Sequence, residues 1–78
     1  MKISIRHDTL PSPTERRRLR TAAGLTGIEL AVAMGVSPAS VYAWETGRRA
    51  PAGLQRAAYI RALKTIKAKL EEDVGNDR

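Results

Sequence analysis

The chain has 78 residues, a formal net charge of +6 and no cysteine. A chain of this length forms one small domain with a marginal core, because it buries only about 60% of its unfolded surface. The lack of cysteine excludes disulfides, cysteine-ligated metal sites and cysteine nucleophiles. No apolar run approaches the roughly 20 residues of a membrane span. The first residues are too polar for a signal peptide, so we expect a cytoplasmic protein without a membrane partner.

Residues 1–11 are expected to form an N-terminal arm. Within it, KISIR at residues 2–6 alternates polar and apolar side chains, which is a weak strand pattern with Ile3 and Ile5 on one side. A frayed arm, a strand paired across a dimer and an arm in a DNA groove are the alternatives. Ile3 and Ile5 are therefore candidate dimer contacts. The single histidine, His7, is expected to be solvated.

The first helix is predicted from Pro13 to about residue 23. Ser12 is placed to cap it, Pro13 suits the first helical position, and Glu15 completes an S-x-x-E capping box. Gly24 should end the helix. Its inward residues are expected to be Leu19, Ala22 and Ala23.

Two short helices joined by a turn are predicted between residues 26 and 47. Thr26 and Glu29 form a T-x-x-E capping box, and Gly35 should end the helix that follows. Ser37 caps the next helix, which should stop at Gly47. The expected core of this unit consists of Leu25, Leu30, Ala31, Met34, Val36, Val41 and Trp44.

This combination of caps, two glycines, apolar spacing and the sequence W-E-T-G-R-R-A-P resembles the helix-turn-helix of the Cro and phage-repressor type, also called the xenobiotic-response-element family. The resemblance covers about residues 19–63. It implies an all-α, lambda-repressor-like bundle of four to five helices that binds double-stranded DNA. Residues 12–63 would form this domain, and residues 64–78 a helical extension and a disordered tail.

The resemblance places the third helix in the major groove. The candidate base contacts are Pro38, Ala39, Ser40, Tyr42, Ala43 and Thr46. Relatives often carry glutamine, serine or arginine at the positions of Pro38, Ala39 and Ala43, and this chain has no long hydrogen-bonding side chain there. We therefore expect modest direct readout, with DNA shape and phosphate contacts contributing more than usual.

Phosphate contacts are expected around this helix, and the basic net charge agrees with a polyanionic partner. The candidates are Arg17, Arg20, Thr26, Gly27, Ser37, Arg48 and Arg49. By the resemblance, Arg20 should also form a structural ion pair with Glu45. Relatives often have glutamine where Gly27 stands. They usually have an aliphatic residue where Arg16 stands, and Leu10 could fill that gap by folding back. The run of arginines at 16–18 is either a solvated face or lies partly beside a phosphate backbone.

One long helix is predicted over residues 52–73, because this stretch has no proline. Leu54, Ala57 and Ala58 should pack on the motif. Beyond them a narrow apolar seam recurs at spacings of 4, 3 and 4, and we interpret it as a dimer surface rather than a frayed tail. Its members are Tyr59, Leu63, Ile66 and Leu70. Residues 75–78 are expected to be disordered.

These features together predict a phage or bacterial transcriptional regulator. The most direct role is a repressor that binds an inverted repeat as a homodimer. One alternative is a DNA-binding antitoxin or accessory subunit whose last helix binds another protein. The other is a protein-interaction module that no longer reads DNA. No enzymatic activity, cofactor or metal is expected, because no catalytic or metal-ligating cluster is visible.

Overall fold

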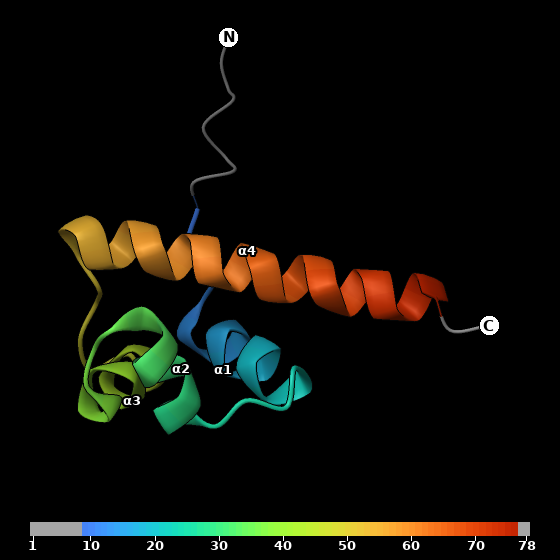
Figure 1. The fold of residues 1–78 in the computed structure, drawn as a ribbon. Coiled ribbons are helices and arrows are strands. Elements are labelled where there is room, and N and C mark those ends of the chain that lie inside the picture. The colour runs from blue at the N-terminus through green and yellow to red at the C-terminus, as the bar shows by residue number, and fades with distance from the viewer. Residues whose placement is uncertain (1–8, 77–78) are drawn as a thin grey trace, which may run out of the picture.

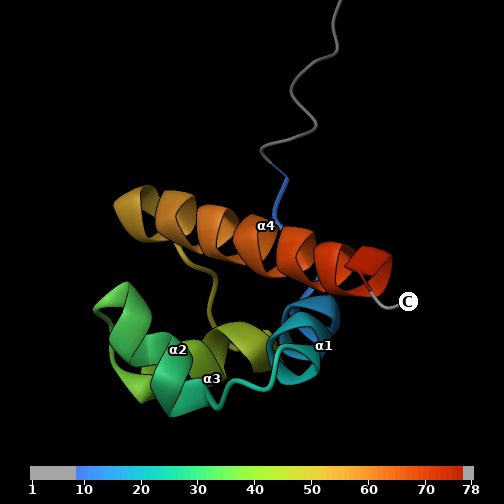
Figure 2. The same cartoon turned by 45° about the vertical axis from the view of Figure 1, so that its right-hand side comes forward.

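The computed structural model describes residues 9–76, with side chains as far as residue 72. It contains α1 (Pro13–Ala22), α2 (Gly27–Met34), α3 (Pro38–Thr46) and α4 (Gly53–Asn76), and no strand within this range (Figure 1). The all-α fold is thereby confirmed. The first three helices form a layer, and α4 lies across it (Figures 1 and 2). The possible strand at residues 2–6 lies outside the described residues.

The bounds of α2 and α3 follow from their caps. The Thr26 hydroxyl accepts from the Glu29 N–H at 3.0 Å, and the Glu29 carboxylate accepts from the Thr26 N–H at 2.8 Å, which completes the expected capping box. The Ser37 hydroxyl accepts from the Ser40 N–H at 3.1 Å. Both helices end on a glycine with positive φ, which glycine adopts without steric cost: Gly35 at 72° and Gly47 at 79°.

The start of α1 differs from the expected capping box. The Ser12 hydroxyl accepts from the Glu15 N–H at 3.2 Å, so the cap itself is present. The Glu15 carboxylate instead accepts two hydrogen bonds from Arg18, at 2.6 and 2.8 Å. The exposed Arg18, one turn along the helix, therefore binds the carboxylate that was expected to accept from the Ser12 N–H in the capping box.

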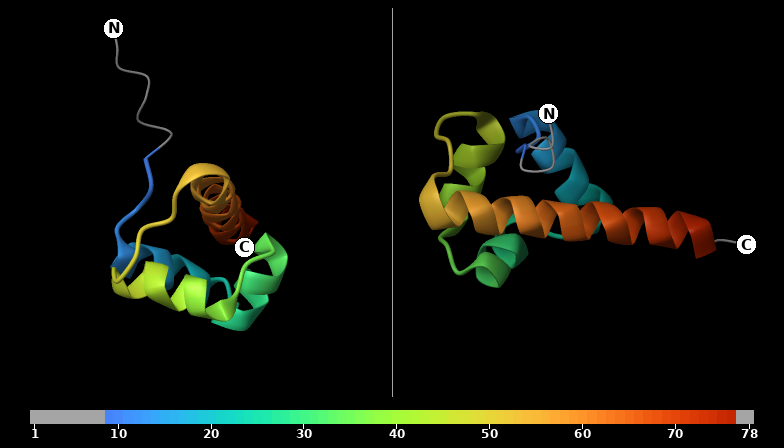
Figure 3. Two further views of the ribbon diagram at one scale, coloured as in Figure 1. Left: turned by 90° about the vertical axis from the view of Figure 1, so that its left-hand side faces the viewer. Right: turned by 90° about the horizontal axis from the view of Figure 1, so that it is seen from above.

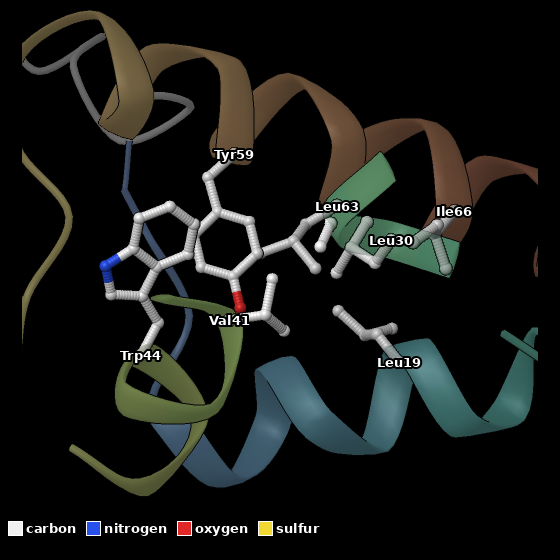
Figure 4. Packing of buried hydrophobic residues seen from close by; sticks show 8 residues of the cluster. Leu19, Leu30, Val41, Trp44, Tyr59, Leu63 and Ile66 are labelled. Carbon is white, nitrogen blue, oxygen red and sulfur yellow. The ribbon is translucent and has the colours of Figure 1, made fainter. Parts of the chain in front are cut away.

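The core lies between α4 and the three-helix layer (Figure 4). All four helices contribute buried side chains: Leu19 from α1, Leu30 and Ala31 from α2, Val41 and Trp44 from α3, and Tyr59, Leu63 and Ile66 from α4. The rings of Trp44 and Tyr59 are tilted by 37° with their centroids 4.9 Å apart. Such an aromatic pair adds about 0.5–1.5 kcal/mol to the effect of burying its area.

The apolar seam of α4 does not form an open dimer surface. Tyr59, Leu63 and Ile66 are 0%, 2% and 8% exposed, because they pack into the core of their own chain. Leu70 is half-buried against the same cluster. The spacing correctly identified one face of α4, but the partner of that face is the layer beneath it. The domain boundary expected at residue 63 consequently falls within one continuous core.

The first turn of α4 makes less contact with the motif than expected. Leu54 is 89% exposed and Ala57 is also exposed, whereas Ala58 is half-buried. The connection from α3 rises away from the layer before α4 begins, so the helix reaches the core only from its second turn (Figure 3). The expectation that Leu54 and Ala57 pack on the motif is therefore wrong.

Two further expectations at helix ends are wrong. Ala22 and Ala23 are exposed, because α1 turns Arg16 and Leu19 towards the core instead. At the other end of the chain, α4 continues through residues 75 and 76, where a disordered tail was expected. Residues 77 and 78 lie outside the described residues.

Tyr59 provides a test of this packing. Its hydroxyl is buried and has no hydrogen-bond partner among the described residues, and burial raises the pKa of Tyr59 to about 12. Tyr59→Phe keeps the ring and removes the unpaired group. We expect its free energy of unfolding at pH 7 to equal the wild-type value or exceed it by about 1 kcal/mol, measured by urea denaturation.

The same variant should change the response to alkaline pH. Between the ordinary tyrosine pKa of 10.0 and about 12, the unfolded chain loses this proton while the folded chain keeps it. Wild-type stability should therefore be complete below pH 10 and fall as the pH rises towards 12. The fall should be smaller in Tyr59→Phe. If Tyr59→Phe lowers the free energy of unfolding at pH 7 by more than about 1 kcal/mol, the hydroxyl has a hydrogen-bond partner.

Candidate nucleic-acid interface

The outer face of α3 is exposed because its other face is fixed in the core. Val41 and Trp44 are 1% and 2% exposed and point towards α4 (Figure 4). The opposite side of the helix carries the candidate base contacts. Of these, Pro38, Ala39, Tyr42 and Thr46 are exposed, and Ser40 and Ala43 are half-buried. The structure thus brings the six residues together on α3.

A surface hollow lies at one flank of this face. It is lined by Ala39, Tyr42, Ala43, Arg48 and Arg49. The backbone N–H groups of Arg48 and Arg49 both donate to the Ala43 carbonyl, at 3.0 and 3.3 Å. The two arginines are thereby tied to the end of α3, and their side chains border the face that carries Tyr42.

A second hollow lies at the other flank. It is lined by Arg17, Arg20, Tyr42, Glu45 and Thr46. Arg17 is exposed and forms no ion pair with another described residue. Tyr42 lines both hollows and is 61% exposed, so it stands between the arginines of the two flanks.

Some hydroxyl groups on this face already form hydrogen bonds within the protein. Thr46 donates to the Tyr42 carbonyl at 2.9 Å, so its hydroxyl remains chiefly an acceptor. The hydroxyls of Ser37 and Ser40 lie 3.0 Å apart. The Tyr42 hydroxyl makes no hydrogen bond to any described residue, and it is the longest polar side chain among the six. Tyr42 is therefore the best-placed group for reading a base edge.

Arg20 and Glu45 form the expected ion pair. The Arg20 Nε and Nη2 donate to the two carboxylate oxygens at 2.6 and 2.9 Å, and Nη1 donates to the Leu25 carbonyl at 2.8 Å. The side chains are 12% and 6% exposed. The hydrogen bond to Glu45 raises the pKa of Arg20. Because every nitrogen of Arg20 already donates within the chain, this geometry favours the structural role over a phosphate contact.

Arg16 was not recognised from the sequence as a buried group. It is only 9% exposed, and its Nε and Nη1 donate to the carbonyls of Pro11 and Trp44 at 2.7 and 2.9 Å. Burial lowers the pKa of Arg16, but arginine stays charged in proteins. Leu10 is partly buried against the core cluster, but Arg16 itself occupies the position where a gap was expected. The available signal was that Arg16 shares a helix face with Leu19.

The start of α2 offers a smaller anion site than expected. The capping box already uses the Thr26 N–H, and it places the Glu29 carboxylate at the same helix end. That carboxylate repels a phosphate. Gly27 is half-buried, and a Cβ there would meet only Val41 Cγ1, at 4.0 Å. A Cβ at position 27 would therefore make only an ordinary van der Waals contact.

Other kinds of site find no support within residues 9–76. Among the side chains that the structure describes, no group of three or more His, Asp or Glu could hold a metal ion. No helix in that range is long and apolar enough to cross a membrane. Ile3, Ile5 and His7 lie outside the described residues, so their expected roles stay predictions.

A comparison with protein families supports this geometry. The family described as a helix-turn-helix domain matches residues 17–73, which include α2, α3 and most of α1 and α4. No curated protein and no solved structure matches the chain. Because the match spans well over half of the sequence and centres on the capped α2–α3 unit, the chain belongs to the helix-turn-helix domain family of DNA-binding domains.

Proposed function

We propose that this protein is a sequence-specific regulator of transcription that binds double-stranded DNA in the cytoplasm, acting as a repressor. The observation that carries the proposal is the exposed outer face of α3 with arginines on both flanks. Arg17 lies on one side of Tyr42, and Arg48 and Arg49 lie on the other. An α-helix fits the major groove of B-DNA, and flanking cations meet the phosphates on either side of it.

The side chains of α3 favour close approach to the bases. Ala39 and Ala43 are short, so the helix axis can lie deep in the groove, where their methyl groups can contact thymine. Ser40, Tyr42 and Thr46 supply the polar groups. So few polar groups distinguish few base pairs. We therefore propose a homodimer on an inverted repeat with half-sites about 34 Å apart, because two-fold symmetry doubles the sequence read.

The dimer contact cannot use Tyr59, Leu63 and Ile66, because they are buried in the core of their own chain. Ile3 and Ile5 of the N-terminal arm and the half-buried Leu70 remain as candidates. An accessory or antitoxin role is a second candidate function. It is favoured by exposed Leu54, which lies beside Met34 and Val36 in a hollow between α2 and α4. A protein partner with an apolar side chain would fit there.

Selection from a random duplex DNA pool tests the proposed function. Purified protein should enrich an inverted repeat, and the spacing of its half-sites would give the distance between the two copies of α3. Retention of DNA without an enriched sequence, lost at moderate salt, would mean that basic charge alone holds the duplex. In that case the protein-interaction role becomes the better reading.

The double substitution of Arg48 and Arg49 by alanine tests the phosphate contacts. We expect weaker binding to all duplexes alike, because phosphates carry no sequence information. The slope of log affinity against log salt concentration should become shallower by about 2, one counterion for each lost contact. Fluorescence anisotropy titrations at three or more salt concentrations would measure both quantities.

Arg61→Ala is the matched control for charge. Arg61 is exposed on α4, so the variant loses one positive charge without touching the α3 face. Its salt slope should equal that of the wild type. Equal weakening of Arg61→Ala and of the single variant Arg48→Ala would show that net charge, rather than position, governs binding.

Gly27→Gln tests the start of α2 by adding a group. The glutamine amide could donate to a phosphate from a position where a Cβ makes only an ordinary van der Waals contact. We expect about 2- to 10-fold tighter binding to specific and unrelated DNA alike, the contribution of one hydrogen bond. Gly27→Ala controls for the effect of a side chain on helix stability. If glutamine binds no tighter than alanine, α2 does not approach the backbone at this point.

A further inference from the structure

The last turn of α3 is held by α1 at two consecutive residues. Arg16 donates from Nη1 to the Trp44 carbonyl at 2.9 Å, and Arg20 binds the Glu45 carboxylate through two nitrogens. Arg16 and Arg20 are one helical turn apart, so they project from the same side of α1. Both side chains are largely shielded from water, where such contacts are stronger than at the surface.

Arg16 is the partner that the Trp44 carbonyl needs. The last carbonyls of a helix have no donor within the helix. At this end the N–H groups of Gly47, Arg48 and Arg49 all donate to the Ala43 carbonyl. Trp44 receives its hydrogen bond from Arg16 instead. A positive charge at this C-terminal end of α3 also interacts favourably with the negative end of the helix dipole.

Arg16 also connects α3 to the rest of the fold. Its Nε donates to the Pro11 carbonyl at 2.7 Å, and its guanidinium carbon lies 5.9 Å from the centroid of the Tyr59 ring. Tyr59 in turn stacks on Trp44. One cation thus contacts the segment before α1, the end of α3 and α4. An aliphatic side chain could fill the same space, but it could not donate to the Trp44 carbonyl.

We propose that Arg16 is a positioning residue that sets the orientation of α3 and so determines which DNA sequence the protein prefers. The inference rests on the proposed function. A small rotation of α3 would move short side chains such as Ser40 and Ala43 away from their base edges. Long side chains such as Arg48 can follow a phosphate through the same movement. Loss of Arg16 therefore weakens discrimination between sequences more than it weakens binding itself.

The test compares wild type, Arg16→Met and Arg16→Lys on two duplexes of equal length. One carries the sequence selected by the wild type, and the other is unrelated. We expect the affinity ratio of the two duplexes to fall about tenfold in Arg16→Met, the effect of about one mismatched base pair. Binding to the unrelated duplex and its salt slope should not change. Arg16→Lys should restore part of the ratio, because lysine can still donate to the carbonyl.

Arg18→Met is the matched control. Arg18 is an exposed neighbour whose guanidinium pairs with Glu15 on the same helix, so its substitution removes the same charge without changing a contact to α3. Its affinity ratio should equal the wild-type ratio. If Arg16→Met loses the same affinity for both duplexes and has a shallower salt slope, the proposal is overturned in favour of a direct phosphate contact. An unchanged ratio in a folded variant would overturn it as well.

Amide hydrogen exchange without DNA separates this inference from the proposed function. In Arg16→Met, the amides of residues 47–49 should exchange faster, whereas those of α2 should keep their wild-type rates. Faster exchange in all four helices would show that Arg16 supports the whole fold, which overturns a specific effect on α3. If the methionine variant does not fold, Arg16→Lys carries the same comparison. A wild type that binds no DNA would refute the function but leave the exchange result valid.

Discussion

The packing of Tyr59 on Trp44 is the contact on which the arrangement of this domain depends. The three helices of the layer are 8 to 10 residues long, and helices of that length are marginal in water without tertiary contacts. Helix α4 covers the layer, and its aromatic residue meets the one tryptophan of α3. Because α3 presents Trp44 to α4, its opposite face must point to solvent. The exposure of the outer face of α3 is thus a consequence of the core.

The sequence predicted the helices better than it predicted their packing. Hydroxyl caps at Thr26 and Ser37 and glycine stops at Gly35 and Gly47 are local signals, and the observed bounds of α2 and α3 agree with them. Apolar spacing is different, because it identifies a helix face without naming its partner. The seam that includes Leu63 was found correctly but assigned to a second chain, since the path of α4 over the layer depends on the connection that precedes it.

The candidate site shows the same division. The residues of the α3 face and the ion pair between Arg20 and Glu45 could be placed from the resemblance, and the structure brings them together. The burial of Arg16 could not be predicted from the sequence. With three successive arginines, it is not known which one faces the core until the orientation of α1 is known. A buried cation is unfavourable unless its donors are satisfied. Two carbonyls and an aromatic ring meet that condition here, and they come from segments far apart in the sequence.

These observations have a common consequence for DNA recognition. A face made largely of short side chains has little ability to adjust to the bases, so its selectivity depends on where the helix itself is held. In this domain the end of α3 is fixed by the buried Arg16 and the part-buried Arg20, and its inner side is fixed by Val41 and Trp44. A rigid helix with short side chains and a flexible helix with long ones are two ways to read a groove. This chain has the features of the first, because α3 carries short side chains on its outer face and is held in place by residues of α1 and α4, and under the proposed function such positioning residues set the sequence preference.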